Sequence, residues 1–161
     1  MATTTTDPER ARLLTARELR AWRGMLRAHA ALVKALDAQL EAAHGLQLSS
    51  YEVLMYLADA EDEQMRMCDL ASSILLSRSG LTRLVDRLQR GGLLERVACD
   101  ADARGAFAKL TPLGRERLAA ARATHLAGVR EMFLDLFTAE EQEALGQAWE
   151  RVLGRAGLPC C

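Results

Sequence analysis

The sequence lacks the features that mark several large classes of protein. Its 4 cysteines form no CxxC pair and show no other metal-ligand spacing: they are Cys68, Cys99, Cys160 and Cys161. No apolar run reaches the roughly 18 residues that a membrane span needs, and the polar, Thr-rich residues 1–10 hold no apolar core of a secretory signal. A Gly-rich phosphate loop, a nucleophile elbow and an HExxH pair are also missing. These absences predict a cytoplasmic protein with reduced thiols that is not an enzyme, holds no metal or cofactor and contacts no membrane.

The size and charge of the chain set the next limits. With 161 residues, 50% of them hydrophobic, it fits a single domain over residues 1–161. The net charge is −1, so overall charge gives no indication of a nucleic-acid partner. The charges are unevenly distributed, however, because residues 66–109 contain eight Lys and Arg against five Asp and Glu, which gives +3 and leaves −4 for the rest. A basic segment in an otherwise acidic molecule can face phosphates while the other surfaces repel DNA.

Apolar periodicity predicts a mainly helical chain that begins with a long amphipathic helix over residues 9–44. Six residues at three- and four-residue steps form its apolar stripe: Trp22, Leu26, His29, Val33, Leu36 and Leu40. A second helix is expected over residues 50–60, because Ser49 and Glu52 have the spacing of a capping box.

A helix-turn-helix unit is predicted next. A short helix over residues 67–75 is followed almost at once by a helix over residues 78–90, with Ser77 as its N-cap and Gly91 and Gly92 at its end. The second of these helices has an apolar face at i, i+3, i+4 and i+7, formed by Leu81, Leu84, Val85 and Leu88.

Two short apolar segments follow, residues 93–98 and 106–110, and they predict a β-hairpin whose charged tip spans residues 99–105. Thr111 followed by Pro112 then predicts an N-cap and the first residue of another long helix. The apolar positions of this helix are expected at Leu118, Leu126, Val129, Phe133 and Leu136.

The helices at the two ends of the chain are too long to be covered by one small core. At 1.5 Å per residue the first helix would be roughly 50 Å long. The C-terminal pair, residues 112–155, leaves a further apolar face, and Thr138 and Glu141 form a capping box that begins its second helix. We therefore expect a symmetric homodimer in which residues 9–44 and 112–155 of two chains pack together. Such a dimer would set two helix-turn-helix units against two DNA half-sites about one helical turn apart.

The helix over residues 78–90 carries basic and hydroxyl side chains on the face opposite its apolar residues. These are Arg78, Ser79, Thr82, Arg83, Asp86, Arg87 and Arg90. Arginine can bind guanine O6 and N7 in the major groove, and short hydroxyl groups can reach phosphates or base edges. The alternative is a solvated surface helix, because charged outer faces are common on helices.

Two sequence blocks resemble the MarR family of winged helix-turn-helix transcription regulators. Residues 76–88, LSRSGLTRLVDRL, resemble its recognition helix, and residues 102–105, DARG, with residues 110–114, LTPLG, resemble its wing and the start of the next helix. The resemblance implies a mainly α fold with a small β-hairpin wing, in which residues 49–111 bind DNA and the long terminal helices form the dimer. It departs from the family at Ala103, where a second basic residue is frequent.

The resemblance also implies a function and a set of binding residues. The protein is expected to be a sequence-specific repressor that binds a pseudo-palindromic operator in double-stranded DNA and is released by a small ligand or ion. The recognition helix would enter the major groove and the wing the minor groove, where Asp102 would orient Arg104. The residues expected to bind DNA are Ser77, Arg78, Ser79, Thr82, Arg83, Arg87, Arg90, Asp102 and Arg104.

The effector site is less defined by the sequence. The ligand cleft of the family would lie between the first, second and fifth helices, close to Trp22, His29, Tyr51, Met55 and Met67. The same residues, at helical spacing, also fit an ordinary core. Two histidines, His29 and His125, are candidates for a metal or an acidic ligand, although a partly buried histidine with an ordinary hydrogen bond is the commoner case.

Two further alternatives stay open. Winged helices also bind proteins instead of DNA, and only the arginines at positions 78, 83 and 104 argue against that reading here. Cys68 begins a helix, where a lowered pKa would allow a redox switch. The opposite expectation for Cys68 is a buried and inert core thiol.

Overall fold

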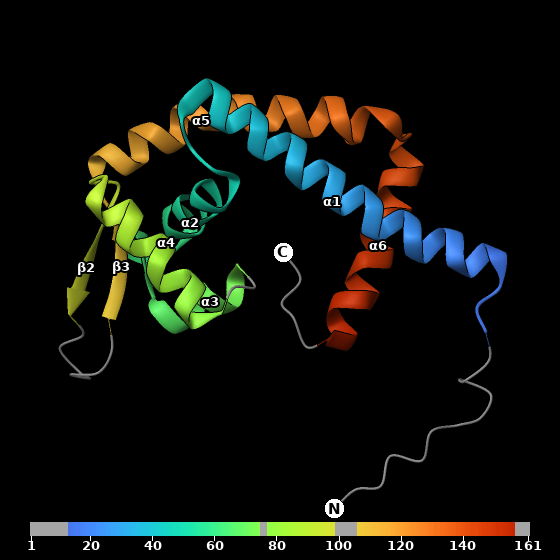
Figure 1. The fold of residues 1–161 in the computed structure, drawn as a ribbon, viewed down its shortest axis with the longest axis horizontal. Coiled ribbons are helices and arrows are strands. Elements are labelled where there is room, and N and C mark those ends of the chain that lie inside the picture. Colours follow the sequence, from blue (N-terminus) through green and yellow to red (C-terminus); the bar gives the residue numbers. More distant parts are fainter. Residues whose placement is uncertain (1–12, 75–76, 99–105, 157–161) are drawn as a thin grey trace, which may run out of the picture. The chain divides into compact units, whose positions relative to one another are not determined.

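The computed structural model describes residues 13–74, 77–98 and 106–156, and it confirms a mainly helical fold with a small antiparallel sheet (Figure 1). The chain divides into two compact units, Met1–Lys34 and Ala35–Cys161. The first helix, α1 (Ala16–His44), begins in one unit and ends in the other.

The first unit consists of the N-terminal part of α1, and a capping box sets where the helix begins. The Thr15 backbone N–H donates to Glu18 Oε2 at 2.7 Å, and the Glu18 N–H donates to Thr15 Oγ1 at 3.3 Å. The predicted start at Glu9 is therefore wrong, since residues 13–15 precede the helix. Three apolar side chains of this part are exposed, namely Trp22, Leu26 and Val33.

The second unit contains the C-terminal end of α1 and all other elements. In chain order these are α2 (Leu48–Asp59), the 3-10 turn η2 (Glu61–Glu63), β1 (Gln64–Arg66), α3 (Met67–Ser73), α4 (Arg78–Arg90), β2 (Leu94–Ala98), β3 (Ala106–Leu110), α5 (Pro112–Met132), the 3-10 turn η3 (Leu134–Leu136) and α6 (Ala139–Ala156).

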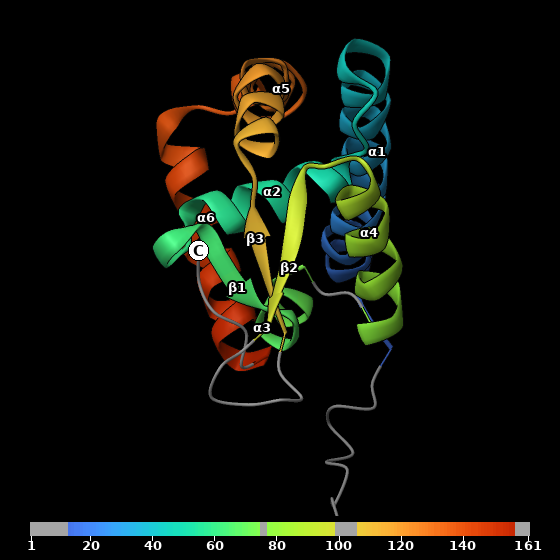
Figure 2. The same cartoon turned by 90° about the vertical axis from the view of Figure 1, so that its left-hand side faces the viewer.

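The sheet has three antiparallel strands in the order β1-β3-β2, so the predicted hairpin is present and has an additional strand (Figure 2). Ala108 of β3 lies opposite both Met65 of β1 and Arg96 of β2. The sequence did not predict β1, because three residues are too few to show alternation and their partner strand is more than 40 residues away along the chain.

The core of the second unit lies between α2, α4, the sheet and the ends of α1 and α5. Its fully buried side chains include Leu40, Tyr51, Leu54, Leu81 and Val85. The predicted core face of α4 is confirmed, because all four of its apolar residues are at most 6% exposed.

The predicted capping box of Ser49 and Glu52 is wrong. Helix α2 begins at Leu48, and its N-cap residue, Gln47, makes no side-chain hydrogen bond to the helix. Instead, Asp37 of α1 accepts a hydrogen bond from the Leu48 N–H at 2.7 Å. A carboxylate from the preceding helix thus satisfies an N–H group that a local side chain would otherwise satisfy.

Helix α5 ends at Met132, earlier than its apolar pattern predicts. The side-chain amide of Gln142 donates to the carbonyls of Leu134 and Phe137, at 3.0 and 3.2 Å, and so stabilises the turn after the helix. Leu136 is consequently 69% exposed and does not continue the apolar face of α5. The predicted capping box of Thr138 and Glu141 is confirmed by two reciprocal hydrogen bonds, of 2.9 and 3.3 Å.

Candidate DNA-binding surface

Helix α4 is held in place at both ends and along its buried face. Ser77 Oγ accepts a hydrogen bond from the Gly80 N–H at 3.1 Å, which confirms the predicted N-cap. At the other end the N–H groups of Gly92 and Leu93 donate to Gln89 and Leu88, and Gly92 has a φ of +71°. This is a Schellman motif, in which glycine is favoured because the backbone is left-handed. The outer face of α4 is therefore presented in a fixed orientation.

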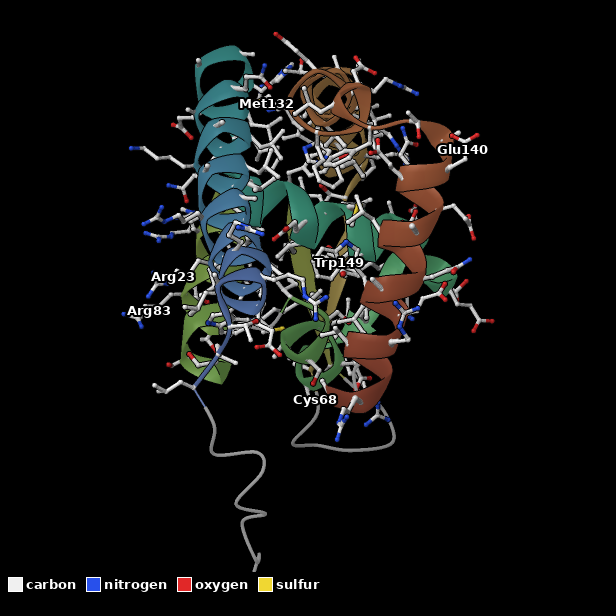
Figure 3. The ribbon with its side chains drawn as sticks, turned by 90° about the vertical axis from the view of Figure 1, so that its right-hand side faces the viewer. Arg23, Cys68, Arg83, Met132, Glu140 and Trp149 are labelled. Atoms are coloured by element: carbon white, nitrogen blue, oxygen red, sulfur yellow. The ribbon has the colours of Figure 1, made fainter. Side chains whose placement is uncertain are left out.

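The outer face exposes Ser79, Thr82, Arg83 and Arg90 (Figure 3 labels Arg83). Arg83 Nε donates to the Ser79 carbonyl at 3.4 Å, and Arg90 Nε donates to the Asp86 carbonyl at 3.3 Å. Each bond uses only the Nε proton of its guanidinium group. Within the part of the chain that the structure describes, the terminal nitrogens remain for a ligand.

Two other charged residues of α4 connect it to its neighbours. Arg87 Nη2 donates to Ser50 Oγ at 3.2 Å, and Ser50 is a buried residue of α2 that is 3% exposed. Asp86 pairs with Arg96 of β2 at 2.7 Å. Both contacts hold α4 against neighbouring elements of the second unit, namely α2 and β2. The sequence did not indicate that Arg87 has Ser50 as a hydrogen-bond partner.

The sheet supplies the second part of this surface. Strands β2 and β3 end and begin on either side of residues 99–105 in the chain, and Arg66 of β1 lies 5.5 Å from the ring centroid of Phe107 on β3. Asp102 and Arg104, which were expected to bind the minor groove, lie outside the described residues, as does the side chain of Arg78.

The effector candidates are divided between the two units. Trp22 and His29 belong to the first unit, where both are exposed. Tyr51 belongs to the second, where it is 2% exposed and its ring centroid lies 4.4 Å from that of His125. Met55 and Met67 are half-buried against the same core.

His125 is the unusual member of that core. Its Nδ1 atom is buried and has no hydrogen-bond partner among the residues that the structure describes. Burial lowers the pKa of His125, and burial also raises the pKa of Tyr51. The pair is therefore uncharged at neutral pH and leaves one polar atom available to a ligand or a water molecule.

Cys68 is exposed in the first turn of α3, and its Sγ donates to Asp69 Oδ1 at 3.5 Å (Figure 3). The expectation that it is a buried core thiol is therefore wrong. Across the described ranges, no three His, Cys, Asp or Glu side chains gather as a metal site would require. No helix among those residues has the length and apolar character that crossing a membrane requires.

The fold and this surface define a winged helix-turn-helix transcription regulator, and comparison with known proteins agrees. A model of the MarR family matches residues 44–105. From Bacillus subtilis, the transcriptional regulator MhqR is 31% identical over 68% of this chain and 73% of its own length, and the transcriptional repressor YetL is 28% identical over 69% and 68%. The solved structure of Sco3205, a MarR family regulator from Streptomyces coelicolor in complex with DNA, has 35% identity and a TM-score of 0.86 over 92% of both chains.

The chain belongs to the MarR family of transcription regulators. The family resemblance inferred from residues 76–88, 102–105 and 110–114 is thereby confirmed, and so is the prediction that the protein is not an enzyme.

Proposed function

We propose that this chain is a homodimeric repressor that binds a pseudo-palindromic operator and leaves it when a small ligand or ion binds. The observation that carries the proposal is the exposed face of α4, where Arg83 and Thr82 project from a helix whose opposite face is fully buried. The surface that we assign to DNA comprises Ser77, Arg78, Ser79, Thr82, Arg83, Arg87, Arg90, Asp102 and Arg104.

The position of each residue on α4 suggests its role. Arg83 and Thr82 are central on the outer face and are assigned to base edges in the major groove. Ser77 and Ser79 lie at the helix N-terminus, where hydroxyl and N–H groups suit a phosphate. Arg90, in the last turn, is assigned to the phosphate backbone.

The wing would extend the interface into the minor groove. We assign this contact to Arg104, with Asp102 holding its guanidinium extended before DNA arrives. An arginine in a narrow A·T-rich minor groove responds to the concentrated negative potential there, so it reads the shape of the DNA as well as its charge.

Two of the similar proteins support this proposal. The Sco3205 structure is a complex with DNA, and YetL is named a repressor. The effector is assigned to the core around Tyr51, His125 and Met55, because a buried Nδ1 without a partner can accept or donate a hydrogen bond there. Thermodynamic linkage makes this coupling reciprocal: if the effector weakens DNA binding by a given factor, DNA weakens effector binding by the same factor.

The test is to select duplexes from a random library with the wild-type protein and to measure variants on the selected site. Arg83→Ala should lose about 1–3 kcal/mol of binding free energy and relax the preference at one base pair. Arg90→Ala should weaken selected and scrambled duplexes alike and make the salt dependence shallower. Arg130→Ala, an exposed position in the last turn of α5, is the matched control.

Failure of the wild-type protein to enrich any sequence would contradict the proposed function and would favour the protein-binding alternative. Equal, sequence-independent losses for the two α4 variants would mean that Arg83 contacts only phosphate.

A further inference from the structure

A second group of basic side chains lies in the first unit, far along the chain from α4. Residues 16–34 contain five Lys and Arg against a single acidic residue, Glu18. With +4 here and +3 in residues 66–109, the remaining residues carry −8. Residues 16–34 of α1 are therefore more strongly basic than residues 66–109, which contain α4.

Four of these side chains form one narrow stripe. Arg20, Arg23, Arg27 and Lys34 are spaced by three, four and seven residues, which at about 100° per residue places them within an arc of roughly 60° on the helix. Glu18 falls on nearly the opposite side of α1 by the same geometry. We refer to Arg20, Arg23 and Arg27 as the α1 arginine stripe.

The stripe is open to solvent. All three arginines are exposed, and Figure 3 labels Arg23 on α1. They line a shallow depression together with Ala16, Leu19 and Gly24, and nothing lies within 4 Å of where a Cβ on Gly24 would be. Within the described ranges none of the three has an ion pair or a hydrogen bond from its side chain. Like charges at these spacings repel and destabilise a helix, so an anion that binds them relieves that repulsion.

We propose that the α1 arginine stripe binds phosphates of duplex DNA that α4 does not contact, an inference that rests on the proposed function. Guanidinium groups bind phosphate through paired N–H donors, which lysine cannot do. From Arg20 to Arg27 the helix rises about 10 Å, which is close to the rise of three nucleotides on one DNA strand. Once α4 holds a duplex, a stripe on the same chain meets that duplex at a high effective concentration.

An anionic membrane surface is the competing partner, because Trp22, Leu26 and Val33 form an apolar face beside the stripe, as in helices that lie on membranes. DNA is favoured because the same apolar side chains belong to the face that the proposed dimer covers. The stripe lies on a different side of α1 from these apolar side chains, at about 100° of rotation per residue.

The experiment compares the full-length wild-type protein with the triple variant R20Q/R23Q/R27Q. Glutamine retains high helix propensity, so α1 should persist, and circular dichroism checks this. The control R130Q/R151Q/R155Q removes the same charge from exposed positions on α5 and α6. The probes are two duplexes of equal length, about four helical turns, one containing the selected site and one scrambled.

The slope of log K against log salt should become shallower by about 2.7 for each bound chain of the stripe variant. Raising salt from about 50 to 200 mM should therefore cost the wild type roughly 40-fold more affinity than the variant for each chain that binds the duplex. The loss should be equal on both duplexes, which leaves sequence preference unchanged. The control variant should keep the wild-type slope. The variant R20K/R23K/R27K retains the positive charge, so it should keep the wild-type slope but bind DNA more weakly, because lysine lacks the paired N–H donors of arginine. It therefore distinguishes the effect of losing charge from the effect of disturbing the helix.

Wild-type affinity and slope in R20Q/R23Q/R27Q would overturn the inference while leaving the proposed function intact. Loss of all preference for the selected site in the wild type would instead overturn the proposed function. Binding of the wild type to phosphatidylserine vesicles that disappears in the stripe variant, with unchanged DNA slopes, would assign the stripe to membranes and overturn its assignment to DNA.

Discussion

His125 links the chemistry of one side chain to the stability of the core. Burial lowers its pKa below the ordinary value of 6.5, so below that pH the unfolded chain binds more protons than the folded one. The free energy of unfolding should therefore fall as the pH drops through about 6.5. Urea unfolding measured between about pH 5 and pH 8 tests this sign.

The His125→Phe variant keeps an aromatic ring against Tyr51 and removes the titrating group, so part of this loss of stability at acid pH should disappear. His29→Gln, which removes an exposed imidazole from α1, is the control and should retain the wild-type pH dependence. An unchanged pH dependence in His125→Phe would show that another group is responsible.

Arg87 can both hold α4 against α2 and bind a phosphate. Its Nη2 atom binds the buried hydroxyl of Ser50, which joins the recognition helix to α2. A guanidinium group has further donors, so a phosphate can bind Arg87 without displacing Ser50. Removal of Arg87 would leave a buried hydroxyl without this partner, so its effect on DNA binding must be separated from its effect on folding.

Helix α5 begins in direct contact with the chain that enters β2. Thr111 caps the helix by accepting from the Gly114 N–H at 3.0 Å and also donates to the Gly92 carbonyl at 2.6 Å. A Cβ on Gly114 would lie 2.0 Å from the Leu93 carbonyl oxygen, a backbone atom that cannot rotate away. The position requires glycine because of this close approach of the backbone.

The Gly114→Ala substitution should consequently lower the free energy of unfolding by about 1–3 kcal/mol or more. Gly146→Ala is the control, because nothing lies within 4 Å of a Cβ there, and it should stabilise α6 by up to about 1 kcal/mol. Chemical denaturation of both variants measures the difference. Equal free energies of unfolding for the two variants would mean that β2 and α5 can move apart without loss of stability.

An ion pair connects α5 to the turn before β1. Arg115 donates to both carboxylate oxygens of Glu63, which lowers the pKa of Glu63 and raises that of Arg115. Asp62 and Glu63 both have a φ of 54°, a left-handed conformation that non-glycine residues seldom adopt. The bidentate contact with Arg115 therefore forms at the residue pair whose backbone conformation is energetically unfavourable.

For the whole molecule the apolar side chains that remain exposed in a single chain are the main evidence for assembly. Leu126 of α5 is 43% exposed, and Trp149 and Val152 of α6 are 40% and 59% exposed. Sedimentation at micromolar concentration in moderate salt should give twice the mass of one chain. Trp149→Glu should shift the protein toward monomer, because it places a charge on the apolar face.

The matched control is Arg151→Glu, which changes charge at an exposed position on the same helix and should leave the dimer intact. A wild-type monomer under these conditions would contradict the proposed dimer and, with it, binding to two half-sites one helical turn apart.

The sequence alone determined the features that local chemistry controls. The caps at Ser77, Thr111 and Thr138 and the buried face of α4 follow from side chains within four residues of one another, and all are confirmed. The start of α1 could also have been predicted, because Thr15 and Glu18 have the capping-box spacing. The helical pattern continues toward Glu9, however, and therefore predicted a start that is too early. The outer face of α4, as the complement of its core face, was predictable for the same reason.

The tertiary structure decided the features that depend on partners distant in sequence. Asp37 satisfies the start of α2, so the local capping box of Ser49 and Glu52 is not used. Gln142 stabilises the turn that ends α5. The three residues of β1 form a strand because they pair with β3. The contact of Arg87 with Ser50 and the burial of His125 against Tyr51 have the same origin. Such contacts join groups whose proximity arises only when the chain folds, and no short-range pattern encodes them.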